Sequence, residues 1–314
     1  MKKDFVNIEF IEGYLFNTGD GFNALQERIT GEQSKNPGTK YISGDINIAV
    51  DEEGLNVITV HYNYVTEITK NGKQSSTYKT LKTLIDNPDK TWIKCGKENC
   101  YKVRCSKVSL AVNDFIANDG TKIASLRNEN GFISIVNELT KDMDKRHKFE
   151  VDMLITRVTH VEANPDKNID NDFVSISGCI FGYGPVLIPA NFTIKDKDGM
   201  NWFENLEISP SNRLFTKVWG RINSLTKTVT KTEESAFGAP AIKEYSRSIK
   251  EYEVTGTSLV PYDYPDETTI TEEDINKMNQ DRQIKLAEIE SRFNKRKQEK
   301  NTALFDIPDG DFPF

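Results

Sequence analysis

The chain has 314 residues, of which 37% are hydrophobic and 28% are charged, and its formal net charge is −7. This composition indicates a globular protein with one large or two small domains. The chain contains no run of about 18 apolar residues, and its opening MKKDFVNIEF lacks an apolar core, so neither a membrane span nor a secretory signal peptide is expected. We therefore expect a cytoplasmic protein.

The negative charge is concentrated in two stretches. Residues 263–274 carry six acids and no base, and the last nine residues carry three more acids, so the remainder has a net charge of +2. Residues 275–305 hold eight bases against four acids. The overall charge therefore does not exclude a polyanionic ligand, and local clusters must decide.

Residues 1–262 are predicted to form mostly β-strands. Apolar and polar residues alternate in segments rich in β-branched and aromatic side chains, most clearly at 56–68, 148–163 and 172–184. Helical patterns are fewer, at 76–86 and in a short stretch around 134–142. Many short strands with few helices favour small barrels or sandwiches, so a mainly β fold is expected.

A weak internal repeat suggests two related halves. The segments KYISGDINIAV and TKVWGRINSLT share Gly-x-Ile-Asn, at Gly44 and Gly220. A glycine within a strand often marks a bulge or a bend where a small barrel curls. We therefore expect residues 1–145 and 146–262 to form two barrels in tandem, or one elaborated barrel.

Three of the four cysteines are close together in CGKENCYKVRC. Cys95, Cys100 and Cys105 are five residues apart, which is not the CxxC spacing of common zinc sites. A zinc site would need a fourth ligand, from Cys179 or a distant histidine. The alternative is a set of reduced thiols alternating along a hairpin, and we expect no metal and no cofactor.

The most informative strand covers residues 214–231. One of its faces suits a core, with Leu214, Thr216, Val218, Gly220 and Ile222. The other face interleaves aromatic and cationic side chains: Phe215, Lys217, Trp219, Arg221, Lys227 and Lys231. Rings that stack on bases contribute about 1–3 kcal/mol each, while cations neutralise phosphates. This face is therefore predicted to bind single-stranded nucleic acid.

The same strand is predicted to continue into a hairpin that returns through residues 243–259. The returning strand would place more aromatic and cationic side chains beside the groove: Tyr245, Arg247, Lys250 and Tyr252. In the N-terminal half, Tyr62 and Tyr64 share a strand face with Lys70 and form a second candidate. The alternative is that Trp219 is a core ring and that the lysines form an ordinary solvated face.

Sequence patterns of enzymes are not found. The chain has no GxxxxGK[ST], GxGxxG, HExxH or GxSxG pattern. Its three histidines, His61, His147 and His160, lie far apart in strand-like segments, where a single histidine is usually a packed or a surface residue. We therefore expect a protein that is not an enzyme.

The composition changes after Pro261. Residues 263–274 are predicted to form an acidic linker, and Thr271-Glu-Glu-Asp is a capping-box start for a charged helix over 275–301. The thin apolar stripe of that helix indicates that it is largely solvated, or that it docks lightly on the barrel or on a second protomer. Residues 302–314 are predicted to be a flexible acidic tail.

The chain closes with FDIPDGDFPF, which resembles the C-terminal tip of bacterial and phage single-stranded DNA-binding proteins. The resemblance is carried by acids, an Asp-Ile-Pro element and the final Pro-Phe: Asp306, Ile307, Pro308, Asp309, Asp311, Phe312, Pro313 and Phe314. It implies an OB-fold for the DNA-binding part. It also implies that the terminal ring enters an apolar pocket on a partner protein, while the carboxylates meet basic residues.

Residues and resemblance together predict a phage-encoded protein of the host cytoplasm that binds single-stranded DNA. Binding would serve replication, recombination and repair, with little sequence preference, and the tip would recruit partner enzymes. The alternative is a viral structural or assembly protein built from β-barrels, whose tail docks a neighbouring subunit.

Overall fold

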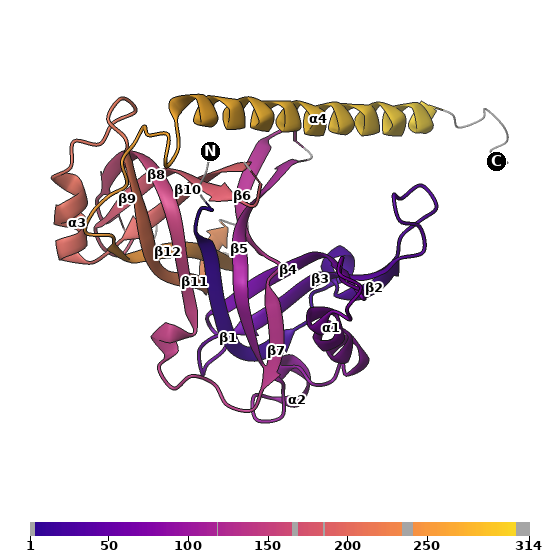
Figure 1. Ribbon diagram of the computed structural model, residues 1–314. Helices are drawn as coiled ribbons and strands as arrows, with labels where there is room; N and C mark the ends of the chain where they lie inside the picture. Colours follow the sequence, from indigo (N-terminus) through magenta and orange to yellow (C-terminus); the bar gives the residue numbers. More distant parts are fainter. Residues whose placement is uncertain (1–3, 118, 165–168, 185, 234–240, 306–314) are drawn as a thin grey trace.

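The computed structural model describes residues 4–117, 119–164, 169–184, 186–233 and 241–305, with the side chains of 225–249 and 298–305 excepted (Figure 1). Its strands form one twelve-stranded sheet. This sheet curls into two five-stranded barrels, because two additional strand pairings, β1–β5 and β8–β11, each close a ring. The prediction of a mainly β fold with small barrels and a C-terminal helix is confirmed.

Barrel A is formed by five strands: β1 (Asn7–Asn17), β3 (Lys40–Ala49), β4 (Val57–Thr66), β5 (Lys102–Ile116) and β6 (Lys122–Glu129). β1 pairs with β3, β3 with β4, β4 with β6, β6 with β5, and β5 again with β1. The β4–β6 pairing is parallel and the others are antiparallel. Shorter elements of this half are η1 (Gly21–Asn23), β2 (Gln26–Ile29), which pairs with β3, the helices α1 (Ser76–Asp86) and α2 (Trp92–Cys95) between β4 and β5, and β7 (Phe132–Val136) and η2 (Met143–Lys145) after β6.

Barrel B repeats this plan with β8 (His147–Val161), β9 (Phe173–Gly182), β10 (Val186–Ile194), β11 (Leu214–Glu233) and β12 (Ala241–Thr257). Its third and fifth strands, β10 and β12, are again the parallel pair, and its first and fourth strands again close the ring. A helix, α3 (Lys197–Glu204), again lies between the third and fourth strands. Both barrels therefore have the strand order of an OB-fold, a five-stranded Greek-key barrel.

The two barrels share one sheet because their first strands pair with each other. β1 and β8 are antiparallel, from Asn7 opposite Val151 to Ile11 opposite His147. The division of the chain near residue 145 stays a prediction, since this pairing makes the halves continuous.

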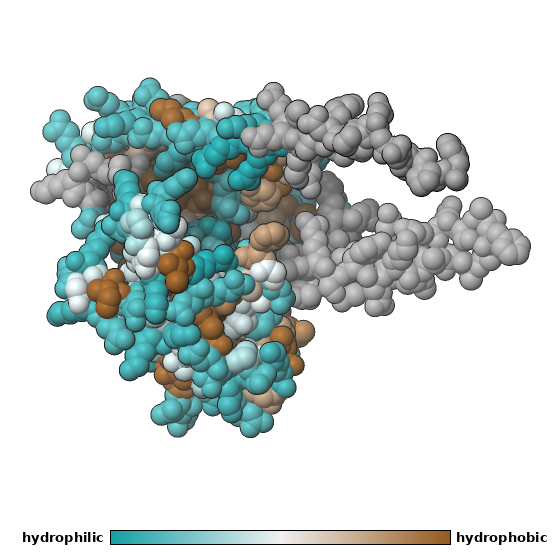
Figure 2. Space-filling view, turned by 90° about the vertical axis from the view of Figure 1, so that its right-hand side faces the viewer, coloured by the Kyte–Doolittle hydropathy of each residue, from teal (hydrophilic) through white to brown (hydrophobic). Residues whose placement is uncertain are grey.

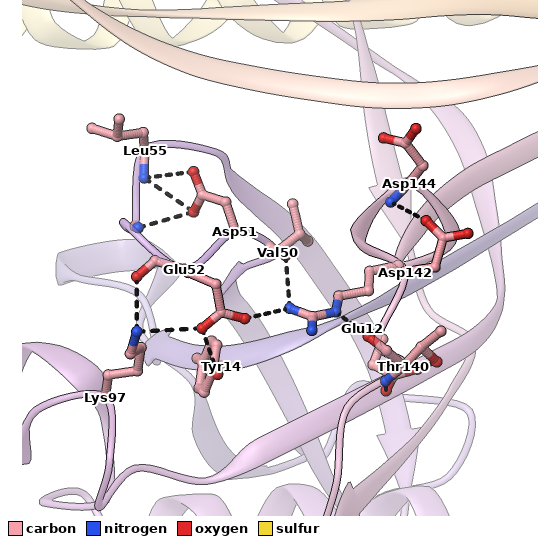
Figure 3. A network of polar contacts seen from close by, with 12 residues as sticks. Glu12, Tyr14, Val50, Asp51, Glu52, Leu55, Lys97, Thr140, Asp142 and Asp144 are labelled. Atoms are coloured by element: carbon pink, nitrogen blue, oxygen red, sulfur yellow. Dashed lines mark hydrogen bonds and ion pairs between the residues drawn. The ribbon is translucent and has the colours of Figure 1, made fainter.

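The connection between the barrels is fixed by a buried polar network (Figure 3). Arg146 donates from Nε to the carbonyl oxygen of Thr140, at 2.6 Å, and from Nη1 to Oε1 of Glu52, at 2.9 Å. Glu12, which is fully buried, accepts from the backbone N–H and the hydroxyl of Thr140. Burial would raise the pKa of Glu12, but the bonds from Arg104 and Thr140 outweigh it and hold the pKa below its usual value. The network therefore fixes the segment that connects β7 to β8 against barrel A.

The alternating pattern of the strands fills the barrel interiors. Apolar side chains at alternate positions along the strands form a single core cluster through both barrels. This cluster includes Ile46, Val60, Val103, Val151 and Ile176. The predicted strands at 56–68, 148–163 and 172–184 correspond to β4, β8 and β9. The alternation is therefore explained by side chains that point alternately into and out of a barrel.

The two glycines of the internal repeat lie at irregularities in the strand pairing, as predicted. The register shifts between Ile42 and Gly44 in β3, and between Trp219 and Gly220 in β11. A Cβ atom on Gly220 would lie 1.8 Å from the carbonyl oxygen of Glu253, so only glycine fits there. β3 is the second strand of barrel A, however, whereas β11 is the fourth strand of barrel B. The sequence repeat therefore does not reflect the duplication of the barrels.

Two local predictions about helices have opposite outcomes. The helix over 76–86 is confirmed as α1, whose N-terminus is capped by the side chain of Ser75, which accepts from the backbone N–H of Tyr78. The prediction of a short helix around 134–142 is wrong. Strand β7 (Phe132–Val136) occupies its first part, because this segment pairs with the edge of β5 at residues 102–106.

The segment after barrel B packs on the outside of that barrel. Apolar residues of this segment and of the following helix form a second cluster with the outer face of barrel B: Tyr262, Tyr264, Ile270, Ile275 and Met278 meet Leu154, Phe181, Leu187 and Phe215. The helix, α4 (Glu272–Phe305), begins with the predicted capping box, since Asp274 and Thr271 exchange hydrogen bonds. The predicted linker at 263–274 is therefore a packed segment.

Helix α4 crosses the molecule from barrel B towards the β5–β6 hairpin of barrel A and then extends past it (Figure 1). The charged helix thus docks on the body of the protein, which was one of the expected alternatives. Within the described part of the chain, no helix is long and apolar enough to cross a membrane.

Candidate nucleic-acid interface

A groove of about 980 Å³ lies where the outer face of barrel B meets barrel A. We call it the interbarrel groove. Its described residues come from both barrels, from α4 and from the loop before β11: Arg157 on β8, Ser177 on β9, Pro189 and Asn191 on β10, Lys250 and Tyr252 on β12, residues 124–126 on β6, Ile275 and Asn279 on α4, and Arg213 in the loop. The groove therefore covers the second and third strands of an OB barrel, the face on which OB-folds bind oligonucleotides and oligosaccharides.

The charge of the interbarrel groove has one sign. Among the described residues, three cationic side chains line it, Arg157, Arg213 and Lys250, and no acidic side chain does. Arg157 is exposed, and its side chain makes no hydrogen bond or ion pair with another described residue. Arg213 is held by the hydroxyl of Tyr264, at 3.0 Å, and by the carboxylate of Glu272, at 3.1 Å. The groove thus offers at least one unpaired cation to an anionic ligand.

Lys250 lies at the junction of the two barrels. Its Nζ atom donates to Oδ1 of Asn128, at 2.8 Å, and lies 5.1 Å from the ring centre of Tyr252. The carboxylate of Glu9 is buried near this ammonium group, and burial raises the pKa of Glu9 to about 8, against the opposing effect of Lys250. The ammonium group of Lys250 therefore favours the ionised form of a buried acid in β1, which burial disfavours.

The floor of the groove presents an oriented amide. The hydroxyl groups of Ser175 and Ser177 both donate to Oδ1 of Asn191, at 2.7 and 2.9 Å. The amide nitrogen of Asn191 makes no hydrogen bond within the described residues, and the side chain is exposed. Because the oxygen is already occupied, Asn191 is left to donate to a ligand oxygen.

The equivalent face of barrel A carries an aromatic pair. The rings of Tyr41 on β3 and Tyr64 on β4 have their centres 4.6 Å apart, and Tyr64 is 48% exposed. β6 connects this face to the interbarrel groove, because its residues 124–126 line the groove while Asn128 pairs with β4. Figure 2 shows that the side of the molecule towards the viewer is mainly hydrophilic, with apolar residues in separate patches. The surface is thus suited to a polar ligand.

The face predicted from residues 214–231 is present, but the two of its cations whose side chains are described, Lys217 and Arg221, are paired with acids. Trp219 is 40% exposed, and Ile222 and Val218 point into the core, as the alternation predicts. Lys217 donates to Glu150 at 2.7 Å, and Arg221 contacts Asp144 at 2.9 Å and Glu253 at 3.3 Å. The hollow of about 800 Å³ beside Trp219 is lined by four acids and three bases. This face is therefore less favourable to phosphates than the interbarrel groove, and its role in binding stays a prediction.

Three aromatic residues of the predicted site are buried, which corrects the expectation that their rings are available. Phe215 is covered by Tyr262 and Tyr264 of the segment that follows barrel B. Tyr62 points into barrel A, where its hydroxyl lies 3.7 Å from Sγ of Cys105. Tyr252 is enclosed between the barrels. None of the three rings can stack on a base in this structure.

Four further predicted side chains, all of the β11–β12 hairpin, lie outside the described part of the structure. Lys227, Lys231, Tyr245 and Arg247 belong to the long β11–β12 hairpin, whose backbone pairing places Lys227 opposite Arg247. Lys70 is exposed in the turn after β4. The C-terminal tip, residues 306–314, also lies outside the described residues.

Cys95 and Cys100 lie in one small cluster, whereas Cys105 and Cys179 belong to two other clusters. Cys95 ends α2 and Cys100 follows in the next turn, whereas Cys105 points into the core of barrel A, so they do not alternate along one hairpin. All four cysteines are unpaired, and burial raises the pKa of Cys105 and of Cys179 to about 12. Within the described residues, no three histidine, cysteine or acidic side chains form a metal-binding group.

Sequence reasoning missed Arg157, Asn191 and Arg213. These residues come from β8, from β10 and from the loop before β11, so only the folded barrel brings them together. One available signal was that Arg157 is the single cation in the second half of an otherwise alternating apolar strand. Lys250 is among the predicted site residues because the returning strand at 243–259 is predicted from the sequence.

These features define a tandem OB-barrel protein with a cation-lined groove at the junction of the barrels. The chain belongs to the YorF family, whose model matches residues 24–292. Among solved structures, it is similar to a deletion mutant of the single-stranded DNA binding protein from Thermus aquaticus, at 13% sequence identity and a TM-score of 0.45. That match covers 84% of this chain and 98% of the other. No curated protein matches the sequence.

Proposed function

We propose that this protein binds single-stranded DNA through the interbarrel groove, largely without sequence preference. The observation that carries the proposal is the groove itself: three cations and no acid among the described lining residues, on the oligonucleotide-binding face of an OB barrel. Net charge alone would not predict this, because the chain is acidic overall.

The chemistry of the groove suits the backbone of a single strand. Arg157 would contact a phosphate, and the amide of Asn191 would donate to a phosphate or base oxygen. The groove itself contains no exposed aromatic ring among its described residues. Base stacking would come from Tyr41 and Tyr64 on the neighbouring face of barrel A. Contacts of this kind read charge and shape more than sequence.

The wider role is part of the proposal. The resemblance of residues 306–314 to the tip of bacterial and phage single-stranded DNA-binding proteins supports recruitment of replication, recombination or repair enzymes. On the same ground we propose a non-enzymatic protein encoded by a phage and acting in the host cytoplasm.

A titration of fluorescently labelled oligothymidine, followed by anisotropy at several salt concentrations, tests the proposal. Binding should weaken with salt, with a log–log slope near −0.7 for each phosphate contacted. A duplex of the same length is the control and should bind more weakly. Equal affinity for the duplex, or affinity independent of salt, would contradict the proposal. Absence of binding together with self-association would favour the alternative of a structural protein.

A further inference from the structure

One border of the interbarrel groove belongs to a hairpin that is held by α4. The β5–β6 hairpin contributes residues 124–126 to the groove, and its β5 strand carries Asp114. Arg282 of α4 binds Asp114 in a bidentate manner, with Nη1–Oδ2 and Nη2–Oδ1 distances of 2.9 and 2.7 Å. Each side chain is only 12% exposed. A bidentate pair shielded from water in this way is strong and directional.

Further contacts continue along the same helix towards the end of the hairpin. Lys122 at the start of β6 forms an ion pair with Glu290 of α4, at 2.8 Å. Leu286 and Ile289 border a small space of about 110 Å³ with Phe115 and Ile123 of the hairpin. The hairpin therefore contacts α4 through charged and apolar groups over more than two helical turns.

The first turns of α4 are anchored on the other barrel. Ile275 and Met278 belong to the apolar cluster on the outer face of barrel B. From Met278 to Ile289 the helix covers a cavity of about 440 Å³, which is lined by β5 on one side and by the β9–β10 region on the other. Helix α4 therefore spans this space and contacts both barrels.

We propose that α4 sets the position of the β5–β6 hairpin over the interbarrel groove, and that Arg282 is a positioning residue for single-stranded DNA binding. This inference rests on the proposed function. Removing Arg282 leaves Asp114 as a shielded and uncompensated charge, which favours separation of the hairpin from the helix. The groove would then lose the fixed border formed by residues 124–126, and the bound strand would lose contacts on that side.

The base of the hairpin is fixed independently, so the effect should stay local. Asn7 exchanges hydrogen bonds with the backbone of Leu110 and also donates to the carbonyl oxygen of Phe181. Lys250 holds Asn128 on the opposite strand. A variant at Arg282 should therefore release the outer part of the hairpin without opening the barrel.

The test compares Arg282→Ala with Arg292→Ala in the full chain. Arg292 lies on the same helix and pairs only with Glu288 of that helix among the described residues, so it is the matched control. We expect Arg282→Ala to weaken oligothymidine binding on the order of tenfold, and Arg292→Ala to leave it unchanged. The double variant Arg282→Asp with Asp114→Arg should recover most of the lost affinity, which a general loss of stability would not allow.

Hydrogen exchange separates the possible outcomes. In Arg282→Ala, amides of residues 114–124 should exchange faster, while those of β9 and β10 should not change.

If the hairpin loosens and oligothymidine affinity stays at the wild-type value, the positioning role is overturned while the proposed function stands. If the wild-type protein does not bind oligothymidine, the proposed function fails and the inference fails with it. If Arg282→Ala does not fold, the charge-swapped double variant provides the test. A double variant that is as stable as the wild type but still binds oligothymidine weakly would overturn the inference.

Discussion

The hydroxyl of Tyr252 in barrel B donates a hydrogen bond to Oδ1 of Asn128 in barrel A, with an O–O distance of 2.7 Å, and both side chains are buried. The amide nitrogen of Asn128 in turn donates to the carbonyl oxygen of Thr59 on β4. One side chain therefore connects β6, β4 and β12 beside the interbarrel groove. The relation between the barrels at the proposed DNA site depends on a buried polar contact of defined geometry.

We predict that Tyr252→Phe lowers the free energy of unfolding by about 1 kcal/mol, because it removes one buried hydrogen bond and keeps the ring. The measurement is urea denaturation followed by circular dichroism. Tyr183→Phe is the control, since that side chain is fully exposed. Equal midpoints for Tyr252→Phe and the wild type would show that the bond does not stabilise the junction.

The buried carboxyl group of Glu9 should make stability depend on pH. Glu9 is 1% exposed, its carboxylate oxygens have no hydrogen-bond partner within the described residues, and burial raises its pKa from 4.5 to about 8. Between these values the folded state keeps a proton that the unfolded state has released. The free energy of unfolding should therefore fall as pH rises from about 4.5 to about 8.

Glu9→Gln should remove this dependence, because the amide does not titrate. The variant should be as stable as the wild type near pH 5 and more stable at pH 8, as measured by urea denaturation at both values. Glu53→Gln, at an exposed position, should follow the wild type. A difference between Glu9→Gln and the wild type that is constant over this range would refute the assignment.

Arg157→Ala should weaken DNA binding more than Lys217→Ala. Arg157 is unpaired within the described residues and lines the groove, whereas Lys217 is already paired with Glu150. Loss of one phosphate contact should reduce the steepness of the log–log salt dependence by about 0.7. Anisotropy titrations of both variants at several salt concentrations give this comparison. A larger loss of affinity in Lys217→Ala would indicate that the DNA-binding site lies on the face of β11.

Deletion of residues 306–314 should leave the affinity for oligothymidine equal or higher, because their three aspartates would compete with DNA for the cationic groove. Any gain should shrink as salt rises, since salt screens charges on exposed surfaces. Binding of partner proteins should be lost. If the shortened protein bound DNA much more weakly, the proposed role of the tip would be untenable.

The sequence predicted most of what depends on local patterns. Alternation located β4, β8 and β9, the helical pattern at 76–86 located α1, and Thr271 located the start of α4. The paired glycines identified two bulges. These features depend on neighbouring residues, so a single sequence contains the necessary information.

The site depended on contacts between distant segments, which the sequence did not provide. The alternation in β11 placed Phe215 on an outer face, but the segment around Tyr262 covers that part of the face. The cation Lys217 was identified, but its partner Glu150 lies on β8. Arg157 and Asn191 become neighbours only when β8, β9 and β10 curl into one barrel.

The most direct measurement places a photo-crosslinking residue, p-benzoylphenylalanine, at Asn191 in one protein and at Trp219 in another. Asn191 lies in the interbarrel groove, whereas Trp219 lies on the exposed face of β11. After irradiation with labelled oligothymidine, the protein substituted at Asn191 should crosslink efficiently, and unlabelled oligothymidine should compete. Efficient crosslinking from Trp219 with none from Asn191 would contradict the account.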